Sequence, residues 1–484
     1  MGAEVEVVII GSGFAGLGAG AQLVGRGEKS FVILEQADRV GGVWRENTYP
    51  GCACDVRVHL YSFSFFPNPD WSHDYARQGE LLDYLERAAT HFGLRPHLRF
   101  EHRVIEAVWS GERWNVRCEN GATFSARFLI AGIGGLSRPA LPSLPGLERF
   151  GGKMFHSAQW DHSFELAGKR VGVIGTGASA IQFVPKIVDQ ARQVTVFQRT
   201  PPWILPRGDQ PIPAWRRSLF RALPFVQWLL RAVLYWQHEL RLPAFSGATW
   251  LMKFARRLAL RHLEQQIADP TLRAKLTPDY TMGCKRVLVS DDFYPALTKP
   301  NCEVVTESIS EVTAAGVKAG TEHECDVLIF GTGFSVSDVI GPLRIVGRDG
   351  VTLNDAWREG AKAWYGTAVH GFPNLFLMTG PNTGLGHSSM VFMIEAQLAF
   401  VMKTIEIVQN SRARWWEVRG DAEAGFNATL QRRLQRTVWL SGCRSWYLDE
   451  RGQNVTLWPG FTFTFRAGLS RFDKRLHHLE GVST

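Results

Sequence analysis

The sequence predicts an α/β fold with two similar strand–turn–helix–strand units and a helical insertion in the second of them. Three observations carry this prediction. A glycine-rich turn follows a short apolar run near residue 10, and the same arrangement returns near residue 175. Between residues 208 and 277 the pattern changes to helical periodicity, rich in Arg and Trp.

The first unit begins with the apolar run Val5–Ile10, which predicts a buried strand. A G-x-G-x-x-G turn follows at once, then a helical stretch of small residues and a second apolar run, Phe31–Leu34, that ends on Glu35. In this context the glycines permit a tight turn and close approach of a pyrophosphate, and the helix N-terminus offers free N–H groups to the phosphates. Glu35 is expected to accept hydrogen bonds from an adenosine ribose. The residues of this turn expected to contact the dinucleotide are Gly11, Gly13, Ala15 and Gly16.

The second unit repeats the pattern between the strands Arg170–Ile174 and Gln193–Phe197. It differs where the second strand ends, because Arg199 stands in place of an acidic residue. A carboxylate repels a 2′-phosphate, whereas a guanidinium binds it through two hydrogen bonds. The second unit is therefore expected to bind NADPH, and the first unit FAD. The residues expected to contact NADPH here are Gly175, Thr176, Gly177, Ala178, Ala180, Arg199 and Thr200.

The segment 208–277 is expected to form a helical insertion that is broken near Pro224 and Pro243. Its basic, aromatic helices are expected to contact the neighbouring domain, and contact with a membrane surface is the alternative. Two apolar strands that end in glycine turns, at 128–135 and 327–334, are expected to mark crossovers. The result is two Rossmann-like dinucleotide-binding domains, with 1–145 and 341–484 for FAD, 146–207 and 278–340 for NADPH, and the insertion in the second.

Composition agrees with a globular protein of several domains, since the 484 residues are 45% hydrophobic and 21% charged. The net charge is +8, and no basic tract interleaved with aromatic residues indicates a nucleic-acid partner. No apolar run of membrane-spanning length and no leader-like N-terminus is present, so a cytoplasmic location is expected.

The seven cysteines are odd in number, and their spacing indicates no disulfide framework, so a reducing compartment is expected. Cys52 and Cys54 are separated by a single residue and lack a second pair. No metal site is expected from them.

Two longer motifs lie outside the glycine turns. One runs from Gly41 to Asp55 and fits [AG]-G-x-W-x4-[FY]-P-[GM]-x3-D at every fixed position. The other runs from Phe150 to Asp161, between the two glycine turns, and fits F-x-G-x3-H-x3-W-[PD] completely. With these motifs the chain resembles the type I Baeyer–Villiger monooxygenases, a class B flavoprotein monooxygenase family, over nearly its whole length.

That resemblance implies a reaction. NADPH reduces FAD, the reduced flavin takes up O2, and the C4a-peroxyflavin attacks a ketone to give an ester or lactone. Arg286 matches the family's arginine that stabilises the peroxide and the adduct, and Asp55 matches the aspartate that pairs with it. Lys285 is expected to help bind the 2′-phosphate. The other residues that the resemblance places at the cofactors are Gly42, Val43, Trp44, Tyr61, Val104 and Met390, with Trp446 beside NADP.

Further residues have expected roles outside the chemistry itself. His156 and Trp160 are expected to serve a hinge between the domains rather than acid–base catalysis. The stretch Gly380–Ser389, with Asn382 and His387, is expected to border the substrate pocket. A small-molecule ketone and O2 are the expected partners, and both the identity of the ketone and the oligomeric state stay open.

Three alternatives share part of the pattern. A flavin-containing monooxygenase that oxygenates nitrogen or sulfur has the same glycine turns, but Trp160, Asp161 and Asp55 favour a ketone. A disulfide reductase needs a redox-active cysteine pair beside the flavin, and Cys52 and Cys54 are too closely spaced for that role. A binding protein that only retains the fold would be purified without flavin.

Overall fold

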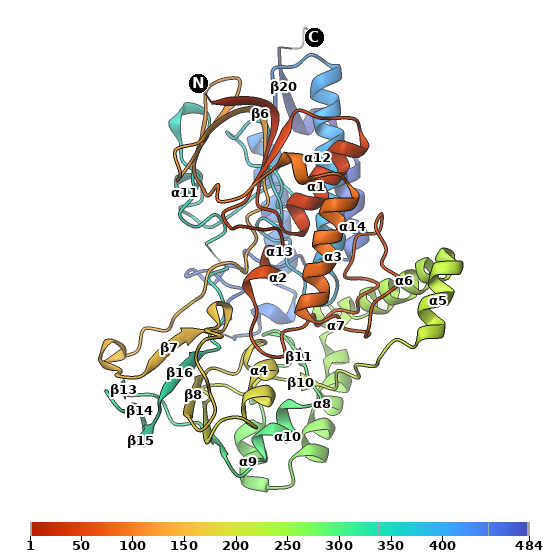
Figure 1. Cartoon of the computed structure of the whole chain (residues 1–484). Helices are drawn as coiled ribbons and strands as arrows, with labels where there is room; N and C mark the ends of the chain where they lie inside the picture. Colours follow the sequence, from red (N-terminus) through yellow and green to blue (C-terminus); the bar gives the residue numbers. More distant parts are fainter. Residues whose placement is uncertain (1, 337, 444, 482–484) are drawn as a thin grey trace.

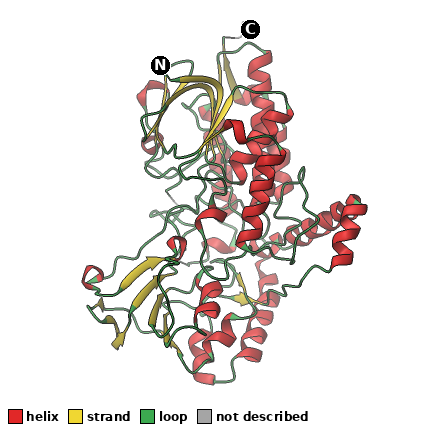
Figure 2. Ribbon diagram, in the orientation of Figure 1, coloured by secondary structure: helices red, strands yellow, loops and turns green. Residues whose placement is uncertain are grey.

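Two separate sheets, one above the other in Figure 1, form the centre of this computed structural model, which describes residues 2–336, 338–443 and 445–481. Helices and loops cover both sheets (Figure 2). The upper sheet has the strand order β17 (Arg344–Val346), β4 (Val104–Trp109), β5 (Trp114–Cys118), β6 (Thr123–Ala131), β1 (Ala3–Ile10), β2 (Phe31–Leu34) and β3 (Leu98–Arg99), with β18 (Leu375–Leu377) paired to β6. The lower sheet has the order β12 (Cys302–Val305), β9 (Gln193–Phe197), β8 (Arg170–Ile174), β16 (Val327–Phe330) and β7 (Lys153–His156).

The first predicted unit is present in the upper sheet. The glycine turn joins β1 to α1 (Phe14–Gly25), and β2 returns parallel to β1, with Ile10 opposite Leu34. All of β2 and the second half of β1 are buried, as strands of a parallel sheet covered on both faces require. The turn therefore lies at the carboxyl edge of the strands, where open α/β sheets bind their ligands.

The second predicted unit is present in the lower sheet. Here the turn joins β8 to α4 (Ala180–Ile187), and β9 lies parallel to β8 with Ile174 opposite Phe197. Each sheet thus presents one glycine turn at its carboxyl edge. The predicted fold class, two Rossmann-like units with a helical insertion in the second, is confirmed.

The chain crosses between the two sheets twice, and the crossing segments lie beside each other. The backbone N–H of Ala140 donates to the carbonyl oxygen of Gly333 at 2.9 Å. After the second crossing, β17 pairs with β4 and β18 pairs with β6, so the C-terminal part completes the upper sheet. Both chain ends consequently lie at the top of Figure 1.

The insertion leaves and rejoins the lower part at two paired strands, β10 (Ile204–Leu205) and β11 (Leu288–Val289). Pro224 and Pro243 lie in the first turn of α6 and α7, where a missing N–H breaks no helical hydrogen bond. The helices of the insertion are α5 (Ala214–Ala222), α6 (Pro224–Glu239), α7 (Leu242–Phe245), α8 (Met252–Gln266) and α9 (Pro270–Leu276).

One large hydrophobic cluster extends from α1 through α4 to the long helix α12 (Met390–Asn410), and so joins the upper and lower parts. Within the described ranges, no helix is both long enough and apolar enough to cross a membrane. The remaining longer helices are α3 (Gln78–His91), α13 (Gly420–Leu434) and α14 (Thr462–Ser470), and the remaining strands are β13 (Glu311–Val312), β14 (Gly316–Ala319), β15 (Thr321–Glu324), β19 (Trp415–Val418) and β20 (His477–Glu480).

Candidate active site

An ion pair between Asp55 and Arg286 forms the centre of the candidate site. Oδ2 of Asp55 accepts hydrogen bonds from Nη2 of Arg286 at 2.5 Å and from Nε at 3.1 Å. The two side chains are 30% and 37% exposed, so the pair is accessible from solvent. Both bonds go to one carboxylate oxygen, and Nη1 of Arg286 has no protein acceptor in the described part of the chain.

Each member of the pair holds the other in its charged form. Burial raises the pKa of Asp55, but the Arg286 guanidinium outweighs it and leaves that pKa below the ordinary value. The Asp55 carboxylate in turn raises the pKa of Arg286 further above its ordinary value, against burial. The site therefore presents a permanent positive charge in a fixed orientation.

Two residues beside this pair were not predicted. Tyr447 is buried, and burial raises its pKa to about 12 although the nearby charge of Arg286 acts in the opposite direction. Arg207 donates from Nη2 to the carbonyl oxygen of Cys54 at 3.0 Å and adds a second positive charge near Asp55. The position of Tyr447 next to Trp446 was a sequence signal, whereas nothing distinguishes Arg207 from other loop arginines.

The first glycine turn and the Gly41–Asp55 motif form a narrow backbone cradle. A Cβ atom on Gly42 would lie 3.0 Å from the Cα of Gly13, and Gly42 has a φ of +52°, which favours glycine. A Cβ on Gly16 would lie 1.8 Å from the carbonyl oxygen of Gly11, so α1 can pack on β1 only with glycine there. The cradle thus brings two backbones together without side chains, next to the N-terminus of α1, which fits a pyrophosphate.

Glu35 lies at the end of β2 and is 3% exposed. Its Oε2 accepts from the backbone N–H and the hydroxyl of Ser12, at 2.9 and 2.7 Å. Its Oε1 accepts from the backbone N–H of Ala37 at 3.0 Å and pairs with Arg45 at 3.1 Å. The carboxylate therefore fixes the conformation of the turn through Ser12, and a ribose at this place would share these oxygens.

Three aromatic rings line the same side of the cradle. Trp44 meets Tyr61 edge to face at 5.8 Å, and Tyr61 meets Phe14, the first residue of α1, at 5.3 Å. Burial raises the pKa of Tyr61 above its ordinary value, and the charges of Asp55 and Arg286 act on it as well, which places this ring near the ion pair. Nε1 of Trp44 is buried beside the Tyr61 hydroxyl, without a hydrogen bond of ordinary length among the described residues. Because buried donors are usually satisfied, this one fits an acceptor supplied by a bound group.

Arg199 and Lys285 lie close together beside the second glycine turn. Burial lowers the pKa of Lys285, and the charge of Arg199 lowers it further. Nζ of Lys285 lies 4.7 Å from the centre of the Tyr280 ring. Two cations that repel each other at an accessible site are a suitable donor set for a phosphate.

The second glycine turn packs against the crossing segment after β16. Gly175 has a φ of +98°, and a Cβ there would lie 2.8 Å from the carbonyl oxygen of Gly331. Thr176 donates from its hydroxyl to the carbonyl oxygen of Thr200 at 3.3 Å, which ties the turn to the end of β9. The structure places this turn beside Arg199, as the sequence predicted, because the turn and Arg199 follow adjacent parallel strands.

Three other predicted cofactor residues make no polar contact with the ion pair. Trp446 is 42% exposed, with its ring 4.5 Å from that of Tyr447. Val104 opens β4 and is buried in a core cluster, and Met390 begins α12. In the residues that the structure describes, none of these three forms a hydrogen bond or an ion pair with Asp55 or Arg286. Their predicted roles at the cofactors therefore have no support from contacts with the ion pair.

The second long motif has structural contacts. His156 is buried, burial lowers its pKa, and its Nδ1 accepts from the backbone N–H of Ala158 at 3.1 Å. Trp160 packs on Phe155 and Phe183, with ring centres 5.2 and 5.3 Å apart. These contacts suit the expected structural role rather than acid–base catalysis.

Comparison with known proteins decides the family. The flavin-binding monooxygenase-like family matches residues 4–339. A Baeyer–Villiger monooxygenase of Pseudomonas aeruginosa is 48% identical over 480 residues, which cover 98% of this chain and 91% of that protein. A second one, of Streptomyces coelicolor, is 48% identical over 478 residues and covers 97% and 92%. The chain belongs to the Baeyer–Villiger monooxygenase family.

Solved structures of other monooxygenases have the same fold as this Baeyer–Villiger monooxygenase. Cyclohexanone monooxygenase from Rhodococcus sp. Phi1, bound to NADP+, matches with a TM-score of 0.89 at 28% identity, covering 99% of this chain and 100% of that one. An oxidized steroid monooxygenase bound to NADP matches with a TM-score of 0.86 at 29% identity and the same coverage. The resemblance that the motifs indicated is thereby confirmed.

A disulfide between Cys284 and Cys443 is present in this monooxygenase, although the cysteine spacing indicated no disulfide framework. The two cysteines are 159 residues apart, with Cα atoms 6.1 Å from each other. Sequence spacing gave no sign of the pair because only the tertiary fold brings these segments together. The bond ties the segment of Lys285 and Arg286 to the segment of Trp446, and the other five cysteines are free thiols.

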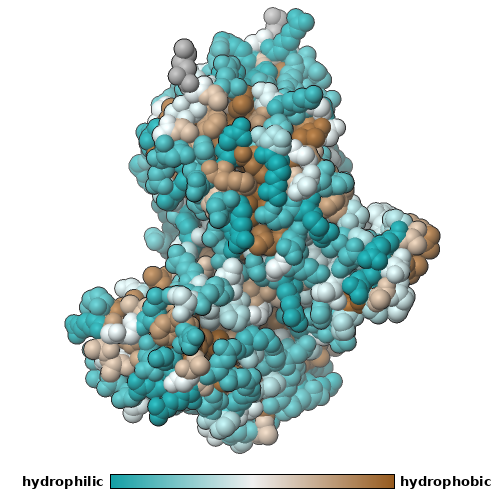
Figure 3. Space-filling model, viewed as in Figure 1, coloured by the Kyte–Doolittle hydropathy of each residue, from teal (hydrophilic) through white to brown (hydrophobic). Residues whose placement is uncertain are grey.

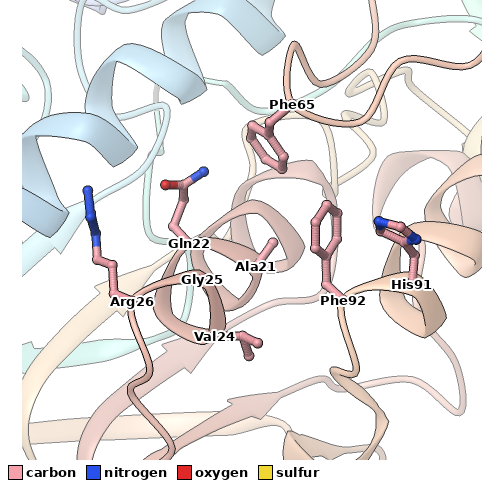
Figure 4. A pocket seen from close by; sticks show the side chains of 8 residues that line it. All are labelled: Ala21, Gln22, Val24, Gly25, Arg26, Phe65, His91 and Phe92. Carbon is pink, nitrogen blue, oxygen red and sulfur yellow. The ribbon is translucent and has the colours of Figure 1, made fainter.

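A surface hollow of about 360 Å³, shown in Figure 4, also exists in this monooxygenase, and neither Asp55 nor Arg286 lines it. Phe65, His91 and Phe92 line it together with the last turns of α1. The first glycine turn is at the opposite, N-terminal end of α1. The hollow is therefore not part of the candidate active site.

Proposed function

We propose that this Baeyer–Villiger monooxygenase uses NADPH and FAD to insert one oxygen atom of O2 beside the carbonyl carbon of a ketone, giving an ester or lactone. The observation that carries the proposal is the Arg286 guanidinium, which Asp55 holds in one orientation through two hydrogen bonds, near the Tyr61 ring of the cradle. Oxygen insertion develops negative charge on oxygen, and a preorganised cation stabilises that charge.

FAD would be held by the first glycine turn and the backbone of Gly42, with the N-terminus of α1 facing its pyrophosphate. Trp44 would donate its Nε1–H, and Tyr61 would pack beside the ring system. Once bound and reduced, FAD supplies the activation of O2. Glu35 is proposed to accept hydrogen bonds from both Ser12 and the ribose.

NADPH would be held by the second glycine turn, with Arg199 and Lys285 on its 2′-phosphate. Trp446, on the segment tied to Lys285 by the disulfide, is proposed to cover the nicotinamide end. Val104 and Met390 are proposed to line the FAD site. The proposal divides the chain into residues 1–145 and 341–484 for FAD and residues 146–207 and 278–340 for NADPH, since each sheet carries one turn.

The protein's own part in the reaction is binding, orientation and charge. Arg286 would stabilise the oxygen that becomes negative, and Asp55 would hold the guanidinium so that it needs no reorientation. Buried Tyr447 would help to exclude water from this place. The cytoplasm is the proposed location, where Cys284 and Cys443 would be held as reduced thiols like the five free cysteines.

The experiment is a panel of cyclic, linear, aromatic and steroidal ketones with the purified, flavin-loaded enzyme. NADPH oxidation is followed at a fixed NADPH concentration, and products are identified by gas chromatography. Stimulation of NADPH oxidation by at least one ketone, with the matching ester or lactone, is the expected result. Oxidation that no ketone stimulates, with sulfoxides or N-oxides as the products from sulfur and nitrogen compounds, would reject the proposal.

A further inference from the structure

Helix α6 turns its polar side chains inward, which is the reverse of an ordinary surface helix. Gln227 donates from Nε2 to the carbonyl oxygen of Asn68 at 2.7 Å, and Glu239 accepts from the backbone and the hydroxyl of Thr462 at 2.8 Å. His238 is buried as well. The inner face of α6 is thus fastened to the rest of the protein by these hydrogen bonds, together with buried Leu234 and the stacking of Tyr235 on Phe392.

The outer face of α6 carries the apolar side chains instead. They follow helical spacing along one side of the helix, and their exposed fractions lie between 46% and 73%. Phe463 extends the row, since its ring lies 5.9 Å from that of Trp236. Helices α5 and α6 stand out from the body at the right of Figure 1, and hydrophobic surface gathers at their outer end in Figure 3. We call this row the outer stripe; its residues on α6 and at the C-cap of α6 are Phe225, Trp228, Leu229, Val233, Trp236 and Leu240.

Exposed apolar side chains are concentrated in this insertion. Of the nineteen large hydrophobic side chains exposed in the described residues, eleven fall between Trp215 and Leu258. Scattered exposed apolar residues need no explanation, but a contiguous row with three aromatic rings indicates a surface that is covered in use. The expected contact with the neighbouring domain holds for the inner face of α6 and leaves the outer stripe uncovered.

The insertion also carries almost all of the excess positive charge. Residues 208–277 contain eleven Lys or Arg and four Asp or Glu, a net charge of +7 of the +8 of the whole chain. Between residues 210 and 263 the only acidic residue is Glu239, which is buried. Arg221 pairs with Asp70 of a neighbouring loop, whereas Lys253, Arg257 and Arg261 on α8 are exposed.

We propose that the outer stripe docks on the surface of a membrane that contains anionic lipids, with α6 lying along the interface. Tryptophan-rich apolar faces combined with basic residues and no spanning helix are the features of a protein that lies on a bilayer. A second copy of the chain fits less well, because a symmetric contact would bring the same basic helices of two copies together. The proposal does not depend on the reaction at the ion pair.

The test is flotation of the flavin-loaded enzyme with vesicles of phosphatidylcholine alone or mixed with phosphatidylglycerol. The variant W228A/W236A shortens the outer stripe, and the control L141A/V351A shortens two exposed apolar side chains outside the insertion. Wild type and control should float with the anionic vesicles, less so as salt rises, and W228A/W236A should bind about tenfold more weakly or worse. Equal melting temperatures establish that all three proteins are folded.

Two results would overturn the proposal. One is vesicle binding by W228A/W236A that equals that of wild type. The other is absence of wild-type binding to anionic vesicles. A dimer in light scattering that W228A/W236A abolishes would then assign the outer stripe to a second copy. Ketone turnover in detergent-free buffer is measured in parallel, because W228A/W236A should keep it whatever the vesicles show.

Discussion

The substitution Asp55→Asn tests the ion pair with the least change in shape. It removes the carboxylate charge but keeps an acceptor oxygen of similar size next to Nη2 and Nε of Arg286. A charge-assisted hydrogen bond contributes roughly 1.5–3 kcal/mol. Both side chains are about a third exposed, which weakens the pair through solvent screening, so we expect a loss of about 2 kcal/mol. That corresponds to a fall in kcat of about 30-fold.

The assay measures ester or lactone formation together with the flavin content of the purified variant. Flavin should stay bound, because the cradle of Gly13 and Gly42 is untouched. The dependence of the free energy of unfolding on pH gives a second readout. Because the pKa of Asp55 is depressed below its ordinary value of 3.8, the pair stabilises the folded wild type above pH 3.8, and this contribution disappears as the pH falls through the lower folded value. The Asp55→Asn variant should not show this loss of stability at low pH.

The matched control is Asp326→Asn. Arg170 and Asp326 form an ion pair of 2.7 Å, with side chains 31% and 33% exposed, at the start of β8 and so at the opposite end of the strand from Gly175. This variant should lose stability without losing turnover per folded enzyme. Wild-type kcat in flavin-loaded Asp55→Asn would refute the reasoning about the ion pair.

Three further results are expected. Arg199→Ala should raise the apparent KM for NADPH by about ten- to a hundredfold, since one charge-assisted contact is lost, and should change that for NADH little; an equal change for both would exclude a phosphate contact. Gly13→Ala should fold with an unchanged melting temperature, because its Cβ would have no protein neighbour closer than 3.6 Å, but the added methyl group should prevent FAD from binding. Gly16→Ala should fail to fold, because its Cβ would lie 1.8 Å from the carbonyl oxygen of Gly11. Flavin bound by Gly13→Ala would argue against the cradle. Cys443→Ser should lower the free energy of unfolding by about 2–5 kcal/mol under oxidising conditions and by nothing after reduction, since it opens a loop of 159 residues. Urea melts of both proteins with and without reductant check this.

The local part of the fold could be predicted from the sequence. The runs Phe31–Leu34, Arg170–Ile174, Gln193–Phe197 and Val327–Phe330 are strands with the expected bounds. Such runs are readable because a strand buried on both faces needs uninterrupted apolar residues, and the flanking glycines fix its end. The insertion was recognisable for the same kind of reason, since its prolines fall in first turns of helices.

The contacts between distant residues of the site could be predicted from the sequence only in part. Asp55 and Arg286 were assigned from motifs, but their contact spans 231 residues, and nothing in the spacing gives its geometry. The disulfide, Tyr447 and the binding of Glu35 to Ser12 depend on packing between distant segments, which carries no periodic signal. The inverted polarity of α6 was hidden as well, because an amphipathic pattern does not tell which face turns inward.

The most direct measurement of the central claim is turnover of a ketone substrate under ¹⁸O2, with the product analysed by gas chromatography and mass spectrometry. The account predicts an ester or lactone that contains one ¹⁸O atom per molecule, with one NADPH consumed for each. An unlabelled product, or NADPH consumption that yields only hydrogen peroxide in the presence of every ketone, would contradict it.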